Sequence, residues 1–227
     1  MLTFSSQPLA VGAIADEKAI VEKFDKSSID LIELRLDSLG ASESVTDFAK
    51  YHAEKDVPIL ITARDPKEGG QNALSFEERL QLLRSLAPYA SAIDVELQNV
   101  DSFDAFLQEQ RDNGTKIILS SHDFETFDHM ATIEAFNQAR AWGADVAKVA
   151  VTLLDPVDLT LFESLLADLN DVPFSLMGMG TYGPASRLLA AQHGSLLNYG
   201  YLGSEPTAPG QWPGPLLKQV LAHCPHF

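Results

Sequence analysis

The sequence has 227 residues, with 16 lysines and arginines against 32 aspartates and glutamates, so its formal net charge is −16. This balance argues against nucleic acid and anionic membranes as partners, because both are bound by clustered basic side chains. No apolar run approaches the roughly 20 residues that span a bilayer, the first residues lack the regions of a signal peptide, and Cys224 is the only cysteine, so we expect a cytoplasmic protein without internal disulfides.

Short β-rich runs alternate with longer amphipathic stretches from one end of the chain to the other. Helical spacing is clear in residues 76–86, where Ser75 and Glu78 form the pattern of a capping box. Strands that alternate with helices favour a parallel sheet that is covered on both faces. The expected strands are residues 9–14, 30–36, 58–62, 92–96, 116–121, 145–151, 173–177 and 195–199.

The number and spacing of these units predict an α/β fold, a single-domain (β/α)8 TIM barrel over residues 1–227. Repeats of about 25–30 residues suit such a barrel. The alternative is an open doubly wound sheet, which lacks support because no G-x-G-x-x-G follows the first strand. In a barrel, functional side chains lie at the C-terminal ends of the strands, so candidate site residues are expected there.

Charged residues occur at the ends of the second and third strands. Glu33 and Arg35 are two residues apart, which places them on the same face of a strand. Buried charges are costly unless they are paired or solvated, so they form either a structural ion pair or a site for a polar ligand. Arg64 ends the third strand, and Glu68 follows in a loop with Gly69 and Gly70. On their own, Arg64 and Glu68 are also typical of solvated surface charges.

The fifth and sixth strands carry the residues best suited to covalent chemistry. His122 lies where an apolar strand gives way to a loop, as expected for a general acid or base, although a structural histidine fits too. Lys148 lies within the otherwise apolar run 146–150. Desolvation lowers the pKa of a lysine and makes its amine nucleophilic, as a Schiff base requires. The alternative is a lysine that extends from a strand end to water.

Two segments near the C-terminus suggest binding functions. The glycine-rich stretch 174–187 ends at Arg187, and it forms either a phosphate-binding loop or a tight connection that brings Arg187 to a carboxylate. Residues 205–212 combine prolines and a glycine with Thr207 and Gln211, which suits an active-site lid as well as an ordinary loop. No H-E-x-x-H, G-x-S-x-G or Walker motif is present. We therefore expect a barrel that uses a lysine and a histidine, with no metal and no cofactor.

Taken together and in chain order, six motifs resemble the type I 3-dehydroquinate dehydratases. The match runs from about residue 9 to residue 213 and so covers nearly the whole chain. Any one motif is weak, whereas six in order form a specific signature. The motifs are IELRLD, TARDPKEGG, SSHDF, ADVAKVAVT, GTYGPASR and TAPGQ.

The resemblance implies a metal-free hydro-lyase, in most cases a homodimeric barrel, for the third step of the shikimate pathway in aromatic amino acid biosynthesis. It implies that Lys148 forms a Schiff base with the C3 ketone of 3-dehydroquinate. It also implies that His122 assists carbinolamine formation, removes a C2 proton and protonates the departing C1 hydroxyl, giving 3-dehydroshikimate and water. Glu68 would orient the histidine, and Arg187 would bind the substrate carboxylate. Residues at positions that hold the ring hydroxyls and shape the closed site are Glu33, Arg35, Arg64, Thr207 and Gln211.

The sequence departs from the family pattern at a few points. Thr207 stands where many relatives carry serine and keeps the hydroxyl, whereas Gly12 and Ala13 provide no donor where some relatives have a serine. The N-terminal segment is short for the hairpin that covers the barrel bottom in some relatives. Two other functions compete: a class I aldolase, which also needs a desolvated lysine, and a catalytically silent binding protein, which would not need Lys148 or His122.

Overall fold

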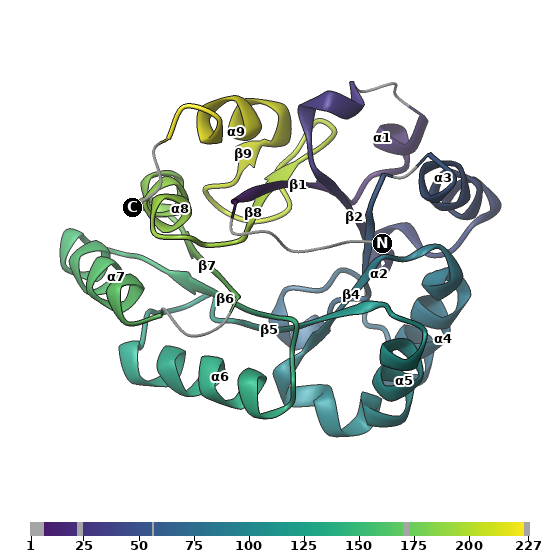
Figure 1. The fold of residues 1–227 in the computed structure, drawn as a ribbon, viewed down its shortest axis with the longest axis horizontal. Helices are drawn as coiled ribbons and strands as arrows, with labels where there is room; N and C mark the ends of the chain where they lie inside the picture. Colours follow the sequence, from purple (N-terminus) through teal and green to yellow (C-terminus); the bar gives the residue numbers. More distant parts are fainter. Residues whose placement is uncertain (1–6, 22–24, 56, 170–172, 225–227) are drawn as a thin grey trace.

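The protein folds around one curled parallel sheet, seen in a computed structural model that describes residues 7–21, 25–55, 57–169 and 173–224. The strands follow the order β7-β6-β5-β4-β3-β2-β1-β8-β9. The two ends of the curled sheet meet between β7 and β8, where the N–H of Leu196 donates to the carbonyl of Phe174 at 2.7 Å. Figure 1 shows the helices arranged around this ring of strands. The predicted TIM barrel is confirmed, and the alternative of an open doubly wound sheet is wrong.

All eight predicted strands are present, with ends displaced by no more than two residues. The short β9 was not predicted, and it pairs parallel to β8 at Gly200 and Trp212. The observed strands are β1 Leu9–Ile14, β2 Leu31–Arg35, β3 Ile59–Thr62, β4 Ala92–Glu96, β5 Lys116–His122, β6 Val146–Thr152, β7 Phe174–Met179, β8 Leu197–Tyr201 and β9 Trp212–Pro213.

The helices begin where local side chains cap their first turns. Ser75 and Glu78 form the predicted capping box at the start of α4. Asp155 and Asp158 form another at the start of α7, with Pro156 in the first turn. The helices are α1 Glu17–Val21, α2 Leu36–Leu39, α3 Glu43–Ala53, α4 Phe76–Leu86, α5 Val100–Asp112, α6 His129–Ala141, α7 Pro156–Asp168, α8 Gly183–Gln192 and α9 Gly214–Leu221.

The inward-facing residues change from apolar to polar along most of the strands. On β4, for example, Ala92 lies in the barrel floor, and Asp94 and Glu96 follow on the same face and are also buried. Polar side chains are therefore brought together above an apolar floor, at the C-terminal ends of the strands. The floor residues are Val11, Leu31, Leu60, Ala92, Ile118 and Val146, and the polar ones two places further along are Glu33, Thr62, Asp94, Ser120 and Lys148.

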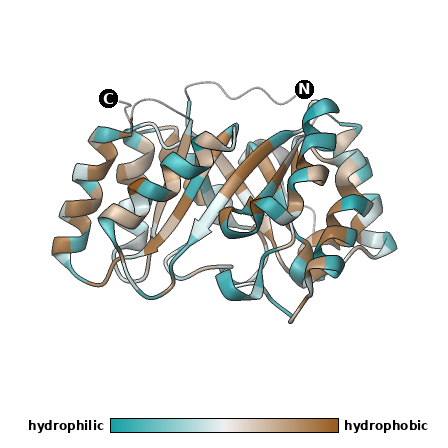
Figure 2. Cartoon of the chain, turned by 90° about the horizontal axis from the view of Figure 1, so that it is seen from below, coloured by the Kyte–Doolittle hydropathy of each residue, from teal (hydrophilic) through white to brown (hydrophobic). Residues whose placement is uncertain are grey.

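The outward-facing strand residues pack against the helices and form the largest apolar cluster, which includes Ile32, Leu34 and Phe162. In Figure 2 the strands are mostly brown, while the surrounding helices alternate between brown and teal, as expected for helices with one buried face. No helix in the described part of the chain is long and apolar enough to cross a membrane.

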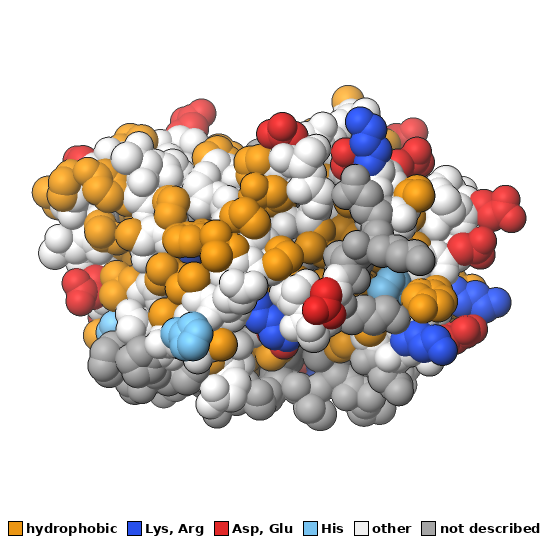
Figure 3. Space-filling model, turned by 90° about the horizontal axis from the view of Figure 1, so that it is seen from above, with side chains coloured by type: hydrophobic (Ala, Val, Ile, Leu, Met, Phe, Trp, Pro, Cys, Tyr) orange, Lys and Arg blue, Asp and Glu red, His pale blue; other side chains and the backbone are white. Residues whose placement is uncertain are grey.

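One side of the molecule has a largely apolar surface (Figure 3). On the side of the molecule shown in Figure 3, hydrophobic side chains form a broad area with few charges in its middle. Large apolar side chains that remain exposed include Leu216 of α9, at 43% of its surface.

Gly12, where the first strand lacks a side-chain donor, is packed too closely to accommodate a side chain. A Cβ atom placed on Gly12 would come within 2.6 Å of the Cδ1 of Leu202. A larger residue at this position would therefore displace Leu202. The expectation about an N-terminal hairpin concerns residues 1–6, which lie outside the described residues.

Candidate active site

Lys148 on β6 is the buried amine of the site. Only 4% of its surface is exposed, so it does not reach water, and the alternative of an extended surface lysine is wrong. Its Nζ lies 2.8 Å from Asp94 Oδ2 and 4.0 Å from Glu33 Oε1. Burial lowers the pKa of Lys148, and the attraction of Asp94 and Glu33 opposes this without reversing it. The amine is thus desolvated as predicted, but two carboxylates from other strands accompany it.

Arg64 links these carboxylates to a second layer of charge. Its guanidinium contacts Asp94 at 3.0 Å, Glu96 at 2.8 Å and the hydroxyl of Ser120 at 2.7 Å. Burial alone would raise the pKa of Asp94, but Arg64 and Lys148 outweigh it and hold that pKa well below its usual range. Asp94 is therefore an ionised group between two cations. Arg64 is buried within this network and is not a solvated surface charge.

His122, at the C-terminal end of β5, forms a hydrogen-bonded pair with Glu68, in the loop after β3. The distance from His122 Nδ1 to Glu68 Oε2 is 2.9 Å, and Gln98 donates to the other oxygen of Glu68 at 2.8 Å. Burial raises the pKa of Glu68 to about 8. Burial also lowers the pKa of His122 well below its ordinary value, and the positive charges of Arg64 and Lys148 act in the same direction.

The two groups of this pair titrate together because they share a hydrogen bond. When Glu68 is ionised, it accepts from the Nδ1–H of His122 and leaves Nε2 free as a base. When Glu68 is protonated, the pair holds one more proton and is the acid form. The geometry thus suits proton transfer in both directions.

Arg187 on α8 is a buried cation with a free donor. It is 2% exposed; its Nη1 donates to the carbonyl of Tyr199 at 3.1 Å and lies 3.6 Å from the sulfur of Met177. Its Nε has no hydrogen-bond partner, and no carboxylate of the described residues pairs with it. Burial lowers its pKa to about 10. Such a guanidinium can bind an anion with its remaining donor.

The glycine-rich segment before Arg187 is a tight connection. A Cβ on Gly178 would lie 2.2 Å from the hydroxyl of Ser186, and one on Gly183 would lie 3.1 Å from the carbonyl of Gly178. These contacts bring α8 close to β7 and carry Arg187 to the barrel mouth. Of the two predicted interpretations, the connection is the one that the packing supports.

Glu33 and Arg35 share a face of β2 but have different partners. Glu33 accepts from the hydroxyl of Thr62 at 2.8 Å. Arg35 is held by Asp37 through two hydrogen bonds of 2.9 and 2.8 Å. They are therefore not an ion pair with each other, because Asp37, just beyond the strand, provides a closer carboxylate.

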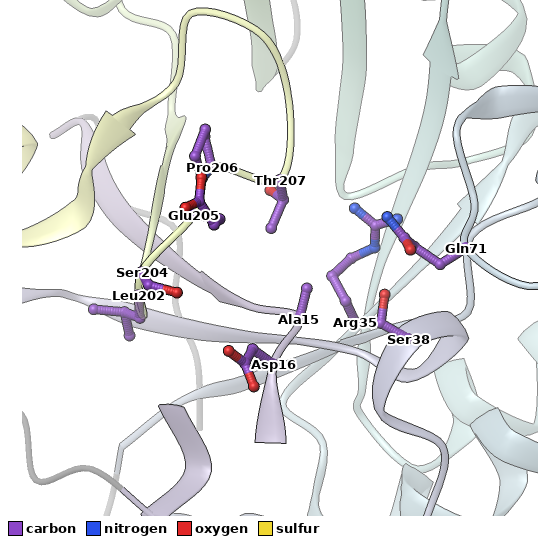
Figure 4. A pocket seen from close by; sticks show the side chains of 10 residues that line it. All are labelled: Ala15, Asp16, Arg35, Ser38, Gln71, Leu202, Ser204, Glu205, Pro206 and Thr207. Atoms are coloured by element: carbon purple, nitrogen blue, oxygen red, sulfur yellow. The ribbon is translucent and has the colours of Figure 1, made fainter. Parts of the chain in front are cut away.

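The loop from β8 to β9 contributes Thr207, Ala208 and Gln211 to the lining of the space around Lys148. The backbone N–H and the hydroxyl of Thr207 both donate to Gln211 Oε1, at 2.8 and 2.9 Å. Beside the loop lies a cavity of about 190 Å³, shown in Figure 4, with Pro206 and Thr207 on one side and Arg35 and Gln71 on the other. It adjoins the space around Lys148, which is only about 40 Å³.

The structure brings all the residues predicted from the sequence to one pocket. That pocket is lined by Glu33, Arg35, Arg64, Glu68, His122, Lys148, Arg187, Thr207 and Gln211, together with Ala150, Met177, Met179, Tyr199 and Ala208. A buried amine, an acid–base pair and an anion-binding arginine around one space are the groups that imine chemistry on a carboxylated ketone needs. In the described residues no cluster of histidine, cysteine or carboxylate side chains is arranged to hold a metal ion.

Comparison with known proteins identifies the family. The model of the type I 3-dehydroquinase family matches residues 7–224. The chain belongs to the type I 3-dehydroquinase family. It is 32% identical over 198 residues to the 3-dehydroquinate dehydratase of Methanothrix thermoacetophila, covering 87% of this chain and 83% of that protein. It is 35% identical over 184 residues to that of Methanocella arvoryzae, covering 80% and 81%.

Solved structures agree with this assignment. The 3-dehydroquinate dehydratase of Enterococcus faecalis superposes with a TM-score of 0.77 at 27% identity, covering 97% of this chain and 93% of that one. The fold also matches that of the Geobacillus kaustophilus enzyme, with a TM-score of 0.83 at 24% identity, covering 96% and 91%. Membership of this hydro-lyase family makes the aldolase interpretation wrong, along with that of a silent binding protein.

The carboxylates of β4 were not predicted from the sequence. Asp94 and Glu96 have the same two-residue spacing as Glu33 and Arg35, and that signal would have placed them on the inner face. Their contact with Lys148 and Arg64 depends on how β4 lies against its neighbours. The spacing therefore predicts the face but not the partner.

A second residue that was not predicted lies outside the barrel wall. Arg79 on α4 is buried and donates to the carbonyl of Ala63 and to Asp65, both at 2.8 Å. It also pairs with Glu96, the carboxylate that contacts Arg64. The helical spacing of residues 76–86 gave no sign of this contact, since an arginine on a helix is most often exposed.

Proposed function

We propose that the chain dehydrates 3-dehydroquinate to 3-dehydroshikimate and water through an imine on Lys148. The observation that carries this proposal is the buried amine of Lys148, which faces the same pocket as the His122–Glu68 pair and Arg187. The family match gives the substrate class.

The proposed reaction begins at the amine. The Lys148 ammonium first gives a proton to His122, and the lone pair of the neutral Nζ attacks the C3 carbonyl of the substrate. That proton returns from His122 to the oxygen of the carbinolamine, which leaves as water. The resulting iminium withdraws electrons from C2, so that a C2 proton becomes acidic enough for His122 to remove. The C–H electrons then form an enamine, and their return expels the C1 hydroxyl, which takes a proton and leaves as water. Hydrolysis of the conjugated iminium uses one water, releases the product and restores the lysine.

The His122–Glu68 pair would also provide both proton transfers of the elimination, from C2 and to the C1 hydroxyl. With Glu68 ionised, Nε2 of His122 is free to accept the C2 proton, and the pair then holds that proton for the departing hydroxyl. The raised pKa of Glu68, about 8, keeps the acid and base forms close in energy near neutral pH. A single pair can therefore act in the formation of the imine and again in both proton transfers of the elimination.

The carboxylate of the substrate would bind Arg187, whose Nε is buried without a partner. A charge-assisted hydrogen bond to an anion would satisfy this donor. Glu33, Thr207 and Gln211 line the pocket and would contact the ring hydroxyls, whereas the donors of Arg35 and Arg64 are already engaged by carboxylates. We therefore propose that the main role of Arg35 and Arg64 is to fix the shape of the site.

Substrate entry would require the β8–β9 loop to move. The space of about 40 Å³ around Lys148 is smaller than a six-membered ring, while the adjoining cavity under Thr207 is about 190 Å³. Displacement of the loop would join the two spaces. This supports the interpretation of the segment around Thr207 and Gln211 as a lid.

The wider context follows the family resemblance. We propose that the reaction is the third step of the shikimate pathway, in the biosynthesis of aromatic amino acids. We also propose that it takes place in the cytoplasm, in a homodimer, on residues 1–227 as one domain.

Trapping of the imine tests the proposal. The protein is incubated with 3-dehydroquinate and borohydride, and the modified peptide is identified by mass spectrometry. We expect one reduced adduct, on Lys148. Lys116 provides a matched control, because it lies on the neighbouring strand but is paired with Asp145 and partly exposed. An adduct on Lys116 alone, or none on the folded protein, would contradict the mechanism.

A further inference from the structure

Tyr199 forms a buried aromatic wall beside the amine of Lys148. It lies on β8, inside the barrel, and only 3% of its surface is exposed. The Nζ of Lys148 is 3.9 Å from the centroid of its ring. The hydroxyl of Tyr199 is buried and has no hydrogen-bond partner. The contact between Tyr199 and Lys148 is therefore made by the ring and not by the hydroxyl.

The face of an aromatic ring attracts a cation, and the attraction is strongest where water is excluded. The distance of 3.9 Å is well inside the range of about 6 Å over which this interaction acts. Both partners are buried, so solvent does not screen it. The ring thus favours a charged nitrogen at this place over a neutral one.

We propose that the ring of Tyr199 stabilises the positive charge on the Lys148 nitrogen through the reaction, first as ammonium and then as iminium. The iminium half of this proposal rests on the proposed function. The ammonium half does not, since it concerns the free protein. Tyr199 would thereby be a further residue of the catalytic machinery, beyond those that the sequence motifs indicate.

The other charged groups around Lys148 do not make the ring redundant. Asp94 on β4 and Glu33 on β2 favour the ammonium, at 2.8 and 4.0 Å, while Arg64 on β3 disfavours it. His122 on β5 also lies close enough to interact with Lys148. An ammonium has three N–H donors for the carboxylates, whereas an iminium nitrogen formed from it keeps one.

The ring face needs no N–H group, because it interacts with the charge itself. Its contribution therefore persists when the amine becomes an iminium and most of its donors are gone. When the iminium forms, the carboxylates of Asp94 and Glu33 lose hydrogen bonds to the nitrogen, because fewer N–H groups remain. The position of Tyr199 suits it to that change.

Two substitutions separate the ring from the hydroxyl. Tyr199→Leu removes the aromatic face, whereas Tyr199→Phe keeps it and removes only the hydroxyl that has no partner. Tyr199→Met provides a second non-aromatic side chain, unbranched and flexible, should the leucine variant fold poorly. Near-ultraviolet circular dichroism shows which variants keep their tertiary structure.

The first experiment uses the free protein and so does not depend on the proposed function. The rate at which an amine reagent modifies Lys148 is followed against pH by peptide mass spectrometry. We expect the midpoint of this profile to fall by roughly one pH unit in the leucine or methionine variant, equivalent to a tenfold loss of ammonium stability. Phenylalanine should restore the midpoint. An unchanged or raised midpoint in both non-aromatic variants would overturn the proposal.

The second experiment measures the iminium by borohydride trapping with 3-dehydroquinate. We expect about a tenfold smaller steady-state adduct on Lys148 in the non-aromatic variants, and recovery with phenylalanine. Equal trapping in all variants would overturn the iminium half. If the unsubstituted protein gave no adduct, the proposed function would fail, while the pH profile of the free protein would still decide the role of the ring.

Discussion

The substitution Asp94→Asn would test whether the site depends on a buried negative charge. In the parent protein, Lys148 and Arg64 lie 2.8 and 3.0 Å from the carboxylate of Asp94. Asparagine keeps the shape of the side chain but leaves both cations without this negative charge. Removing one partner of a buried pair costs about 3–5 kcal/mol. We expect about 3 kcal/mol, the lower end, because the amide oxygen still accepts hydrogen bonds and Lys148 can release its proton.

The dependence of this loss on pH gives a second, independent magnitude. Because the pKa of Asp94 is lowered in the folded protein, its contribution to stability is complete above the unfolded value of 3.8 and declines as the pH falls below it. Each pH unit in that range corresponds to about 1.4 kcal/mol. The difference between the parent protein and the variant should therefore be about 1 kcal/mol smaller at pH 3 than at pH 7.

The assay is unfolding in urea, followed by tryptophan fluorescence at both pH values. Asp104→Asn is the control, since Asp104 is exposed on α5 and its loss should change the free energy of unfolding by less than about 0.5 kcal/mol. A loss of less than about 1 kcal/mol for Asp94→Asn, or a loss of equal size at both pH values, would refute the assignment of Asp94 as a buried counter-charge.

Three further substitutions test the acid–base pair, the anion site and the lid. In the parent enzyme, kcat/KM should rise with pH around an apparent pKa near 8, which we assign to Glu68. In Glu68→Gln this rise should occur at lower pH, towards the lowered pKa of His122. A rise at the same pH in both proteins would contradict the proposed acid–base role of the His122–Glu68 pair. Arg187→Met should raise KM by roughly a hundredfold yet raise the melting temperature, because it removes a buried charge without a carboxylate partner; unchanged KM would exclude carboxylate binding. Gly210→Ala should raise KM by hindering lid closure and should also lower the free energy of unfolding, because Gly210 has φ +75° and a Cβ would lie 2.8 Å from the carbonyl of Gly180; an unchanged KM would contradict the proposed role of the loop as a lid.

The barrel and the location of the candidate site residues could be predicted because their signals are local. Alternating strands and helices fix the fold class, and the capping box of Ser75 and Glu78 is contained within one turn. Lys148 is conspicuous because its immediate neighbours are apolar. Each of these patterns depends on residues within a few positions of one another, so it can be recognised in the sequence alone.

The partners of those residues could not be predicted, since they come from distant parts of the chain. The amine of Lys148 meets Asp94, which is 54 residues away and on a strand that is not its neighbour in the sheet. Arg35 pairs with Asp37 instead of Glu33 because the chain turns just after β2. Such contacts depend on strand register and barrel curvature, which side-chain spacing does not contain.

Glu96 has a consequence for how this barrel can change during evolution. One of its oxygens contacts Arg64 inside the barrel, and the other contacts Arg79 on the helix layer outside. Loss of either arginine leaves part of the same buried carboxylate uncompensated. Substitutions at position 79 should therefore be inherited together with changes at position 96 or 64, although no substrate atom would touch the helix. In homologues that lack Arg79, we therefore expect position 96 or 64 to differ as well.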